Sequence, residues 1–357
     1  MSSGPRVVLK IGTTSLITDG TLDPEKVARL CEAVCLGISA GLTPVVVTSG
    51  AIAIGRSRHP ALAAGTDAAQ EQAIQQVAAA VGQGLLYAAL RESFAARGVE
   101  TGQVLLTPYD LIEPARGGRV LATFDQLAEL GMVAVVNEND ALGVRNNDVL
   151  AALVSGLVGA RLLLLLTNVP GLYDGNPRLA DARRIDRVPV LTPAFEAMAG
   201  DSIGDGGTGG MLLKLSACWI ATYAGVRTVI ADTADPTVLV AADAGAAVGT
   251  EFSSRSFPGG APDTGRLWRA FRTPPVGTLS CGAGASLAVE HRRPLRRVDV
   301  ITARGAFRAG DVVNITGPDA RLLARGSVRY PVSTVESGCT PSTELLISSD
   351  YVQIRED

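Results

Sequence analysis

The stretch VVNENDALGVRNND, residues 135–148, places seven amide and carboxylate side chains directly after an apolar strand. Asn and Asp favour turns and helix N-caps, but this preference accounts for only two or three of the seven. We therefore predict a site for a polar ligand at the end of this strand. The seven side chains are those of Asn137, Glu138, Asn139, Asp140, Asn146, Asn147 and Asp148.

Two lysines and a glycine-rich loop supply groups that hold phosphate. Lys10 lies inside the apolar strand VVLKI (7–11). It could snorkel to the surface, but we expect it to reach a phosphate, because burying an unpaired ammonium is costly. The loop GDGGTGGMLLK (204–214) brings glycine amides to a helix N-terminus and ends on Lys214, without the GK[ST] ending of a Walker A motif. Together with the Asp and Asn cluster, these groups favour phosphoryl transfer, which needs charge neutralisation and positioning.

The scarcity of histidine limits which chemical groups could accept the phosphoryl group. The chain holds only His59 and His291, so His-based triads and His-rich metal sites are poorly supported. A carboxylate acceptor needs no general base, because it is already ionised at neutral pH. The histidine count therefore fits phosphoryl transfer to a carboxylate.

The elements that must position these residues alternate between apolar strands and helical patterns over about the first 230 residues. A helix is expected from the pair Asp23-Pro24, another over about 70–97, and a third over 211–224. This alternation predicts an α/β fold with an open, mainly parallel sheet sandwiched by helices, in which ligands bind beyond the carboxyl ends of the strands. The expected strands are 7–11, 44–48, 104–107, 133–136, 162–167 and 226–231.

The pattern changes after about residue 250, where Pro and Gly become dense. We expect one domain over 1–260, a linker over 261–274 and a small β-rich domain over 275–357. Several arginines make the last part more basic, which a solvated surface explains better than a nucleic-acid patch. Its strand-like segments are GTLSC, SLAVE, VDVITARGAFRAGDVVNITGP, RLLARGSVRY and VQIRE.

Composition argues against several other classes of protein. The chain has 357 residues, of which 47% are hydrophobic, so a sizeable core is expected, and its formal net charge of -3 argues against broad nucleic-acid binding. No apolar run reaches membrane-spanning length and no signal peptide pattern precedes the first strand, so we expect a cytoplasmic protein. Five widely spaced cysteines without a CxxC motif predict reduced thiols.

These motifs together resemble the amino acid kinase family, in the branch that phosphorylates the side-chain carboxylate of glutamate. The C-terminal segments ITARGAFRAGDVVNI and ARGSVRY resemble a PUA domain. The resemblance implies transfer of the ATP γ-phosphoryl group to L-glutamate, giving glutamyl 5-phosphate, the first step of proline biosynthesis. It is carried, over about residues 5–260, by VVLKIGTTSL, VVVTSGAIAIGR, AAVGQ, QVLLT, VVNENDA, NND, LLLLLTNVPGLY with NPR, and AGDSIGDGGTGGMLLKLSA.

The resemblance also implies roles for individual residues. Lys10 and Lys214 would neutralise the transferring phosphoryl group, and Asp148 would hold both lysines in place. Mg²⁺ would bridge the phosphates, and no side chain is assigned as its ligand. The amino acid would be bound by Ser49, Gly50, Ala51, Asp140 and Asn147. The nucleotide would lie against Lys10, Gly12, Thr13, Thr167, Asn168, Thr208, Gly209, Gly210, Met211, Leu212, Leu213 and Lys214.

Partners are implied in the same way. The substrates would be ATP and glutamate or a similar acid, and the chain would form a homodimer or homotetramer. The labile acyl phosphate would be handed to glutamyl phosphate reductase. Neither a membrane nor RNA is expected as a partner.

The chain departs from the family pattern at a few positions. Arg145-Asn146 stands where the family has Gly-Asp, Asn168 stands where it has Asp, and Ala122 lies in a stretch where it has Asn-Ala-Arg. These changes leave open a divergent carboxylate kinase that acts on a related amino acid in a specialised pathway. An alternative of another class is an RNA-binding or regulatory protein that acts through the PUA-like domain.

Overall fold

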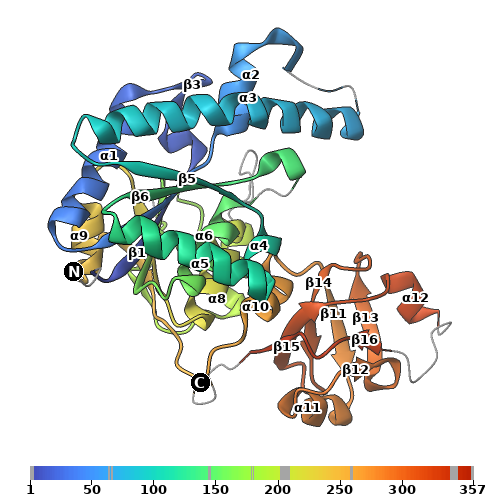
Figure 1. Cartoon of the computed structure of the whole chain (residues 1–357). Helices are drawn as coiled ribbons and strands as arrows, with labels where there is room; N and C mark the ends of the chain where they lie inside the picture. Colours follow the sequence, from blue (N-terminus) through green and yellow to red (C-terminus); the bar gives the residue numbers. More distant parts are fainter. Residues whose placement is uncertain are drawn as a thin grey trace.

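A computed structural model describes residues 4–62, 65, 67–143, 146–177, 179, 181–201, 210–257, 260–337 and 345–354. The chain forms a large α/β unit followed by a smaller β-rich unit. Figure 1 shows the two units beside each other, with helix α10 (Thr264–Phe271) where they meet.

The larger sheet has eight strands in the order β5-β6-β4-β1-β7-β9-β10-β8. The strands from β5 to β9 in this order run parallel, β10 runs antiparallel to β9, and β8 pairs parallel to β10. The predicted mainly parallel sheet is therefore confirmed. The strands are β1 (Arg6–Ile11), β4 (Thr43–Val47), β5 (Thr101–Leu106), β6 (Val133–Glu138), β7 (Leu162–Thr167), β8 (Arg187–Val188), β9 (Arg227–Asp232) and β10 (Gly249–Phe252).

Helices cover both faces of this sheet, so its central strands β1, β4, β6 and β7 are largely apolar, with the buried polar exceptions Lys10, Asn137 and Glu138. Successive residues of β1 alternate between two cores, with Val7 and Leu9 in one and Val8 in the other. The first core includes α1 (Pro24–Ser39), α3 (Ala68–Ala95) and α9 (Val238–Asp243). The second includes α4 (Pro108–Ile112), α5 (Pro114–Glu129), α6 (Asn147–Leu157), α7 (Pro193–Asp201) and α8 (Gly210–Tyr223).

Aspartate side chains cap the starts of α1, at the predicted pair Asp23-Pro24, and of α3. Asp23 accepts hydrogen bonds from Glu25 N and Lys26 N at the start of α1, and Asp67 accepts one from Gln70 N at the start of α3. The helix expected over about 70–97 is therefore α3, shifted by two residues. Within the described ranges, α3 is the one helix whose length and composition would allow it to cross a membrane, and it packs along α2 (Ala51–Arg58) and α1.

The smaller unit contains a five-stranded sheet in the order β13-β11-β14-β15-β17. The segment SLAVE, expected as a strand, instead lies in helix α11 (Ala283–Glu290), and that prediction was wrong. Ala285, Ala288 and Val289 are buried with the spacing of one helical face, a pattern that five residues are too few to reveal. The strands are β11 (Gly277–Cys281), β13 (Val300–Gly305), β14 (Val312–Thr316), β15 (Leu322–Ser327) and β17 (Val352–Gln353), with a separate pair β12 (Leu295–Arg296) and β16 (Leu345–Ile347).

One hydrophobic core of the larger unit extends into the smaller unit, which also has a core of its own. Leu322, Val352 and Ile354 of the smaller unit belong to the same cluster as Trp219 of α8 and Phe271 of α10. The segment expected as a linker, 261–274, thus contains a helix that packs on both α8 and β15. The remaining short elements are the hairpin β2 (Ile17–Thr18) and β3 (Thr21–Leu22), helix α12 (Val332–Glu336), and the 3-10 helices η1 (Thr13–Ser15), η2 (Pro60–Leu62), η3 (Asp140–Leu142) and η4 (Arg297–Asp299).

Candidate active site

A cavity of about 900 Å³ opens at the carboxyl ends of the central strands. Its lining includes Gly12 after β1, Ser49 after β4 and Thr167 at the end of β7. The N-terminal parts of α6 and α8 complete it, with Asp148 and Lys214. This is the place where an open parallel sheet binds ligands.

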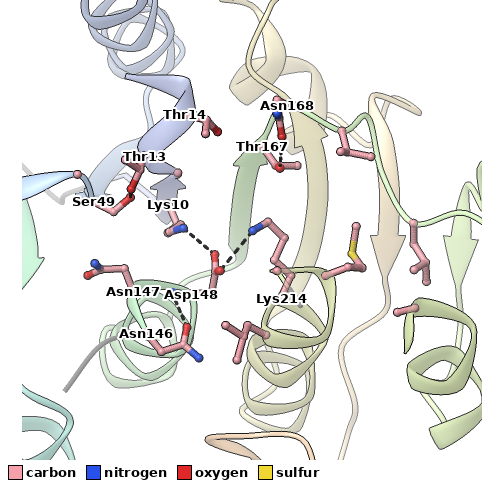
Figure 2. Close-up of a pocket in the computed structure, with 18 of the residues that line it drawn as sticks. Lys10, Thr13, Thr14, Ser49, Asn146, Asn147, Asp148, Thr167, Asn168 and Lys214 are labelled. Atoms are coloured by element: carbon pink, nitrogen blue, oxygen red, sulfur yellow. Dashed lines mark hydrogen bonds and ion pairs between the residues drawn. The ribbon is translucent and has the colours of Figure 1, made fainter. Parts of the chain in front are cut away.

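Two lysines converge on one carboxylate inside this cavity. Lys10 Nζ lies 3.0 Å from Asp148 Oδ1, and Lys214 Nζ lies 3.3 Å from Asp148 Oδ2. Figure 2 shows the two ammonium groups approaching the carboxylate from opposite sides. Lys10 comes from β1, Asp148 from the first turn of α6 and Lys214 from α8, so three distant parts of the chain meet at one point.

Burial and charge set the protonation states of this cluster. Lys10 and Asp148 are each 6% exposed. Burial lowers the pKa of Lys10 below its ordinary value, Asp148 opposes this change and Lys214 adds to it. Burial alone would raise the pKa of Asp148, but the two lysines outweigh it and lower that pKa. Asp148 is therefore an ionised carboxylate that pairs with both lysines.

Part of the Asn and Asp cluster is structural. Asn146 caps α6, because its Oδ1 accepts from the backbone N–H groups of Asp148 and Val149, both at 3.2 Å. Asn137 Nδ2 donates to Gln83 Oε1 at 2.6 Å, and Glu138 Oε2 accepts from Asn146 N at 2.6 Å. The bond to Glu138 holds the start of α6 against the end of β6, and so helps to position Asp148, whereas the bond to Gln83 joins β6 to α3.

The opposite wall of the cavity begins at the end of β4. Ser49 Oγ donates to the carbonyl of Ile11 at 2.9 Å and accepts from Thr13 Oγ1 at 3.3 Å, which ties this strand end to the loop after β1. Gly50 caps α2 with φ of 109°, a left-handed conformation that disfavours other residues. A Cβ at this position would also approach Ile17 Cδ1 to 2.9 Å, so both the backbone conformation and the close packing after β4 favour glycine.

The model of the amino acid kinase family matches residues 5–232, which include every strand of the larger sheet up to β9. The chain belongs to the amino acid kinase family. Two curated relatives are glutamate 5-kinases: one from Mycobacterium ulcerans (strain Agy99), 38% identical over 95% of this chain and 92% of its own length, and one from Mycobacterium tuberculosis (strain CDC 1551 / Oshkosh), 38% identical over 95% and 90%. Among solved structures, carbamate kinase from Giardia lamblia bound to AMP-PNP has a TM-score of 0.53 at 16% identity and covers 71% of this chain and 100% of its own. At this level of sequence identity, the similarity concerns the fold alone.

Most of the predicted site residues of this amino acid kinase lie around the cavity. Of those that the structure describes, Ala51 and Leu212 are the two that do not line it; Ala51 is 2% exposed in the core and Leu212 packs against the other core. Thr208, Gly209 and Arg145 lie outside the described residues. Ala122 is exposed on α5, and Asn168 accepts from Thr167 Oγ1 at 3.4 Å. The lining residues are Lys10, Gly12, Thr13, Ser49, Gly50, Asp140, Asn147, Asp148, Thr167, Asn168, Gly210, Met211, Leu213 and Lys214.

Sequence reasoning missed other residues of this amino acid kinase that line the cavity. Arg56 lies one turn beyond Ile52 on α2, the helix that follows the predicted substrate-binding residues Ser49, Gly50 and Ala51. This helical spacing could have identified Arg56 from the sequence. Gln75 comes from α3, and the sequence around it carries no sign of a site. Tyr173 and Asn176 follow β7 in the segment GLYDGNP, whose turn residues mark a loop at the correct strand end.

Proposed function

We propose that this amino acid kinase transfers the γ-phosphoryl group of ATP to the side-chain carboxylate of L-glutamate, giving glutamyl 5-phosphate in proline biosynthesis. The observation that carries the proposal is the pair of ammonium groups, 3.0 and 3.3 Å from one buried carboxylate, inside a cavity at the strand ends. Two cations at one point suit a migrating phosphoryl group, whose charge is spread over three oxygens. The glutamate 5-kinase relatives support glutamate as the acceptor.

In this reaction an oxygen of the acceptor carboxylate forms a bond to the γ-phosphorus, and the bond from that phosphorus to the β–γ bridging oxygen breaks. Lys10 and Lys214 stabilise the negative charge on the phosphoryl oxygens during this exchange. Asp148 takes no proton, because it is ionised, and it holds the two ammonium groups at a fixed separation. The acceptor needs no base, in keeping with the absence of histidine from the cavity lining as described.

Mg²⁺ is part of the proposal as a companion of ATP. In the described part of the chain, no three His, Cys, Asp or Glu side chains gather where they could hold a metal ion. This fits Mg²⁺ that arrives on ATP phosphates, since such ions keep several waters and take few protein ligands. When bound, the ion would add positive charge beside the phosphates.

The pH dependence of turnover follows from Lys10. We expect kcat/KM for ATP to fall as the pH rises through an apparent pKa below the ordinary lysine value of 10.5, because burial lowers the Lys10 pKa and the neutral amine loses its charge. In Lys10→Arg, whose guanidinium stays charged, this alkaline fall should move to higher pH in whatever activity remains. Identical alkaline limbs in the two proteins would assign the titration to another group.

The acceptor end of the cavity predicts a separate effect. Asp140 is 8% exposed, lines the cavity at η3, and supplies a carboxylate for the substrate's ammonium group. We expect Asp140→Ala to raise the KM for glutamate about 10²-fold while the KM for ATP stays within about twofold. Steady-state titrations of each substrate give both values. An unchanged glutamate KM would remove Asp140 from the amino-acid site.

The acceptor itself is tested by a coupled ADP-release screen over glutamate, N-acetylglutamate, aspartate and related acids. Hydroxylamine traps an acyl phosphate as a hydroxamate, so the product is identified chemically. Glutamate should give the highest kcat/KM together with a γ-hydroxamate. A higher value for another acid would make the chain a carboxylate kinase of different specificity.

Two further parts of the proposal rest on the family resemblance. They are self-association as a homodimer or homotetramer, and hand-off of the acyl phosphate to glutamyl phosphate reductase. The PUA-like assignment of residues 275–357 has the same basis, whereas the cytoplasmic location and the domain boundaries are proposed from the sequence pattern. The mixed five-stranded sheet, with its parallel β11–β14 pair, is the structural observation that accompanies that assignment.

A further inference from the structure

A fully buried arginine contact crosses from the smaller unit to the larger one. Arg325, in the middle of β15, is 1% exposed. Its Nη1 and Nη2 donate to the two carboxylate oxygens of Glu196 at 2.7 and 2.5 Å, and its Nε donates to Asn314 Oδ1 at 2.8 Å. A buried, bidentate arginine–carboxylate pair is among the strongest and most directional polar contacts in proteins.

Glu196 passes this contact on to the helix that carries Lys214. Its Oε1 also accepts from Trp219 Nε1 at 2.8 Å, so one carboxylate joins α7, α8 and β15. Trp219 is fully buried, stacks on Phe271 of α10 with ring centroids 5.2 Å apart, and lies 5.2 Å from the Arg325 guanidinium. The indole is thus fixed by a hydrogen bond at its edge and by contacts on its rings.

The position of these residues connects them to the cavity. Trp219 lies five residues after Lys214 on the same helix, a separation of about 7.5 Å along the axis. Ala199, three residues after Glu196 on α7, lines the cavity, as do Gly210 and Met211 at the start of α8. The ion pair therefore fixes the two helices that flank the glycine-rich segment 202–209 in the sequence.

We propose that Arg325 is a positioning residue for phosphoryl transfer: from the C-terminal unit, through Glu196 and Trp219, it sets the position of α8 and hence of the Lys214 ammonium group against Asp148. The C-terminal unit thereby contributes to the geometry of the phosphoryl-transfer site without touching a substrate. This inference rests on the proposed function. It gives the contact between the two units a role in catalysis.

The test compares two arginines that cross the same boundary. Arg325→Met removes the contact to Glu196 and keeps an unbranched side chain of suitable length for the core. The control is Arg272→Ala: Arg272 follows α10, donates to Ser327 Oγ at 2.8 Å and to the carbonyl of Gly310, and touches neither α7 nor Trp219 in the contacts of the described chain. Thermal melting, kcat, both KM values and the Kd of AMP-PNP with Mg²⁺ are measured for each variant at a temperature where it is folded.

Arg325→Met should raise the AMP-PNP Kd roughly tenfold and lower kcat about 10²-fold, with the glutamate KM within about twofold of wild type. Arg325→Lys should recover part of both losses, because its ammonium keeps one bond to Glu196. Arg272→Ala should lower the Tm and leave Kd and kcat unchanged. Equal losses of Tm in Arg325→Met and Arg272→Ala, with wild-type Kd and kcat in both, would make Arg325 a purely structural contact and overturn the proposal.

If Arg325→Met does not fold, Glu196→Gln provides the same measurement, since it keeps the volume and removes the charge; wild-type Kd and kcat in that variant would also overturn the proposal. The AMP-PNP arm contains no acceptor. A wild-type protein that binds AMP-PNP but gives no product from glutamate therefore refutes the proposed function alone, while the effect of Arg325 on binding still decides the present inference.

Discussion

Lys214→Ala should lower kcat by roughly 10²- to 10³-fold, because it removes one of the two cations that face the transferring phosphoryl group. The Nζ of Lys214 lies 3.3 Å from Asp148 Oδ2, at the end of α8 that lines the cavity. Helix α8 contains no other basic residue that could replace it. The lost stabilisation belongs to the transition state more than to bound ATP. The fall in kcat should therefore exceed the rise in the ATP KM.

The measurement is steady-state ADP release with circular dichroism and thermal melting as the test of folding. Lys214→Arg is the matched variant: it keeps the charge, but its planar guanidinium has a different shape, so it should recover only part of the rate. Turnover like that of wild type in Lys214→Ala would exclude the residue from catalysis.

Asp148→Asn should have the second largest effect, on both rate and stability. The amide no longer neutralises two ammonium groups that are held close together, so kcat should fall about 10²-fold as the lysines move apart. Breaking a buried ion pair by removal of one partner typically costs about 3 kcal/mol of unfolding free energy. In this cluster the side chains of Lys10 and Asp148 are buried, and that of Lys214 is 12% exposed. Chemical denaturation at neutral pH measures that loss.

The loss should depend on pH with a definite sign. The pKa of Asp148 in the folded protein is below the ordinary value of 3.8, so its stabilising effect is complete above that value and disappears as the pH falls through the lower folded pKa. The difference in unfolding free energy between wild type and Asp148→Asn should therefore be constant near neutral pH and shrink below about pH 4.

Asp235→Asn is the control for this experiment. Asp235 is a surface carboxylate whose pKa is lowered by hydrogen bonds from Thr237, so it shares the direction of the pKa shift and lacks the lysines. Its replacement should leave kcat unchanged. A difference between wild type and Asp148→Asn that stays the same down to acid pH would mean that the carboxylate is not the stabilising group.

The convergence of the site was predictable from the sequence because parallel strands end at one edge. Once Lys10 and the Asn and Asp cluster are assigned to the ends of strands in such a sheet, their proximity follows from topology. The function of single residues within the cluster was less accessible. Asn137 and Asn146 make structural hydrogen bonds, whereas Asp148 holds the lysines, and the residue types alone give no means to separate these roles.

Contacts between distant, ordinary-looking residues were not predictable. Arg325 and Glu196 are 129 residues apart, and each reads as a surface charge in its own segment. Gln75 enters the cavity from the N-terminal third of α3, where the local pattern indicates only a helix. The error at SLAVE has a related cause, because a short apolar run fits a strand and a helix equally well, and packing in the smaller unit decides between them.

The pairing of both site lysines with Asp148 also bears on whether the reactive product could modify the protein. An acyl phosphate acylates unprotonated amines, and the proposed product would form beside two of the three lysines in the chain. Asp148 opposes the lowering of the Lys10 pKa by burial, so it favours the protonated form of this amine, which has no lone pair with which to attack. The third, Lys26, donates to the carbonyls of Thr14 and Ile17 at 2.9 and 3.0 Å. The same aspartate that organises the cations thus serves as a guard against self-modification by a reactive anhydride.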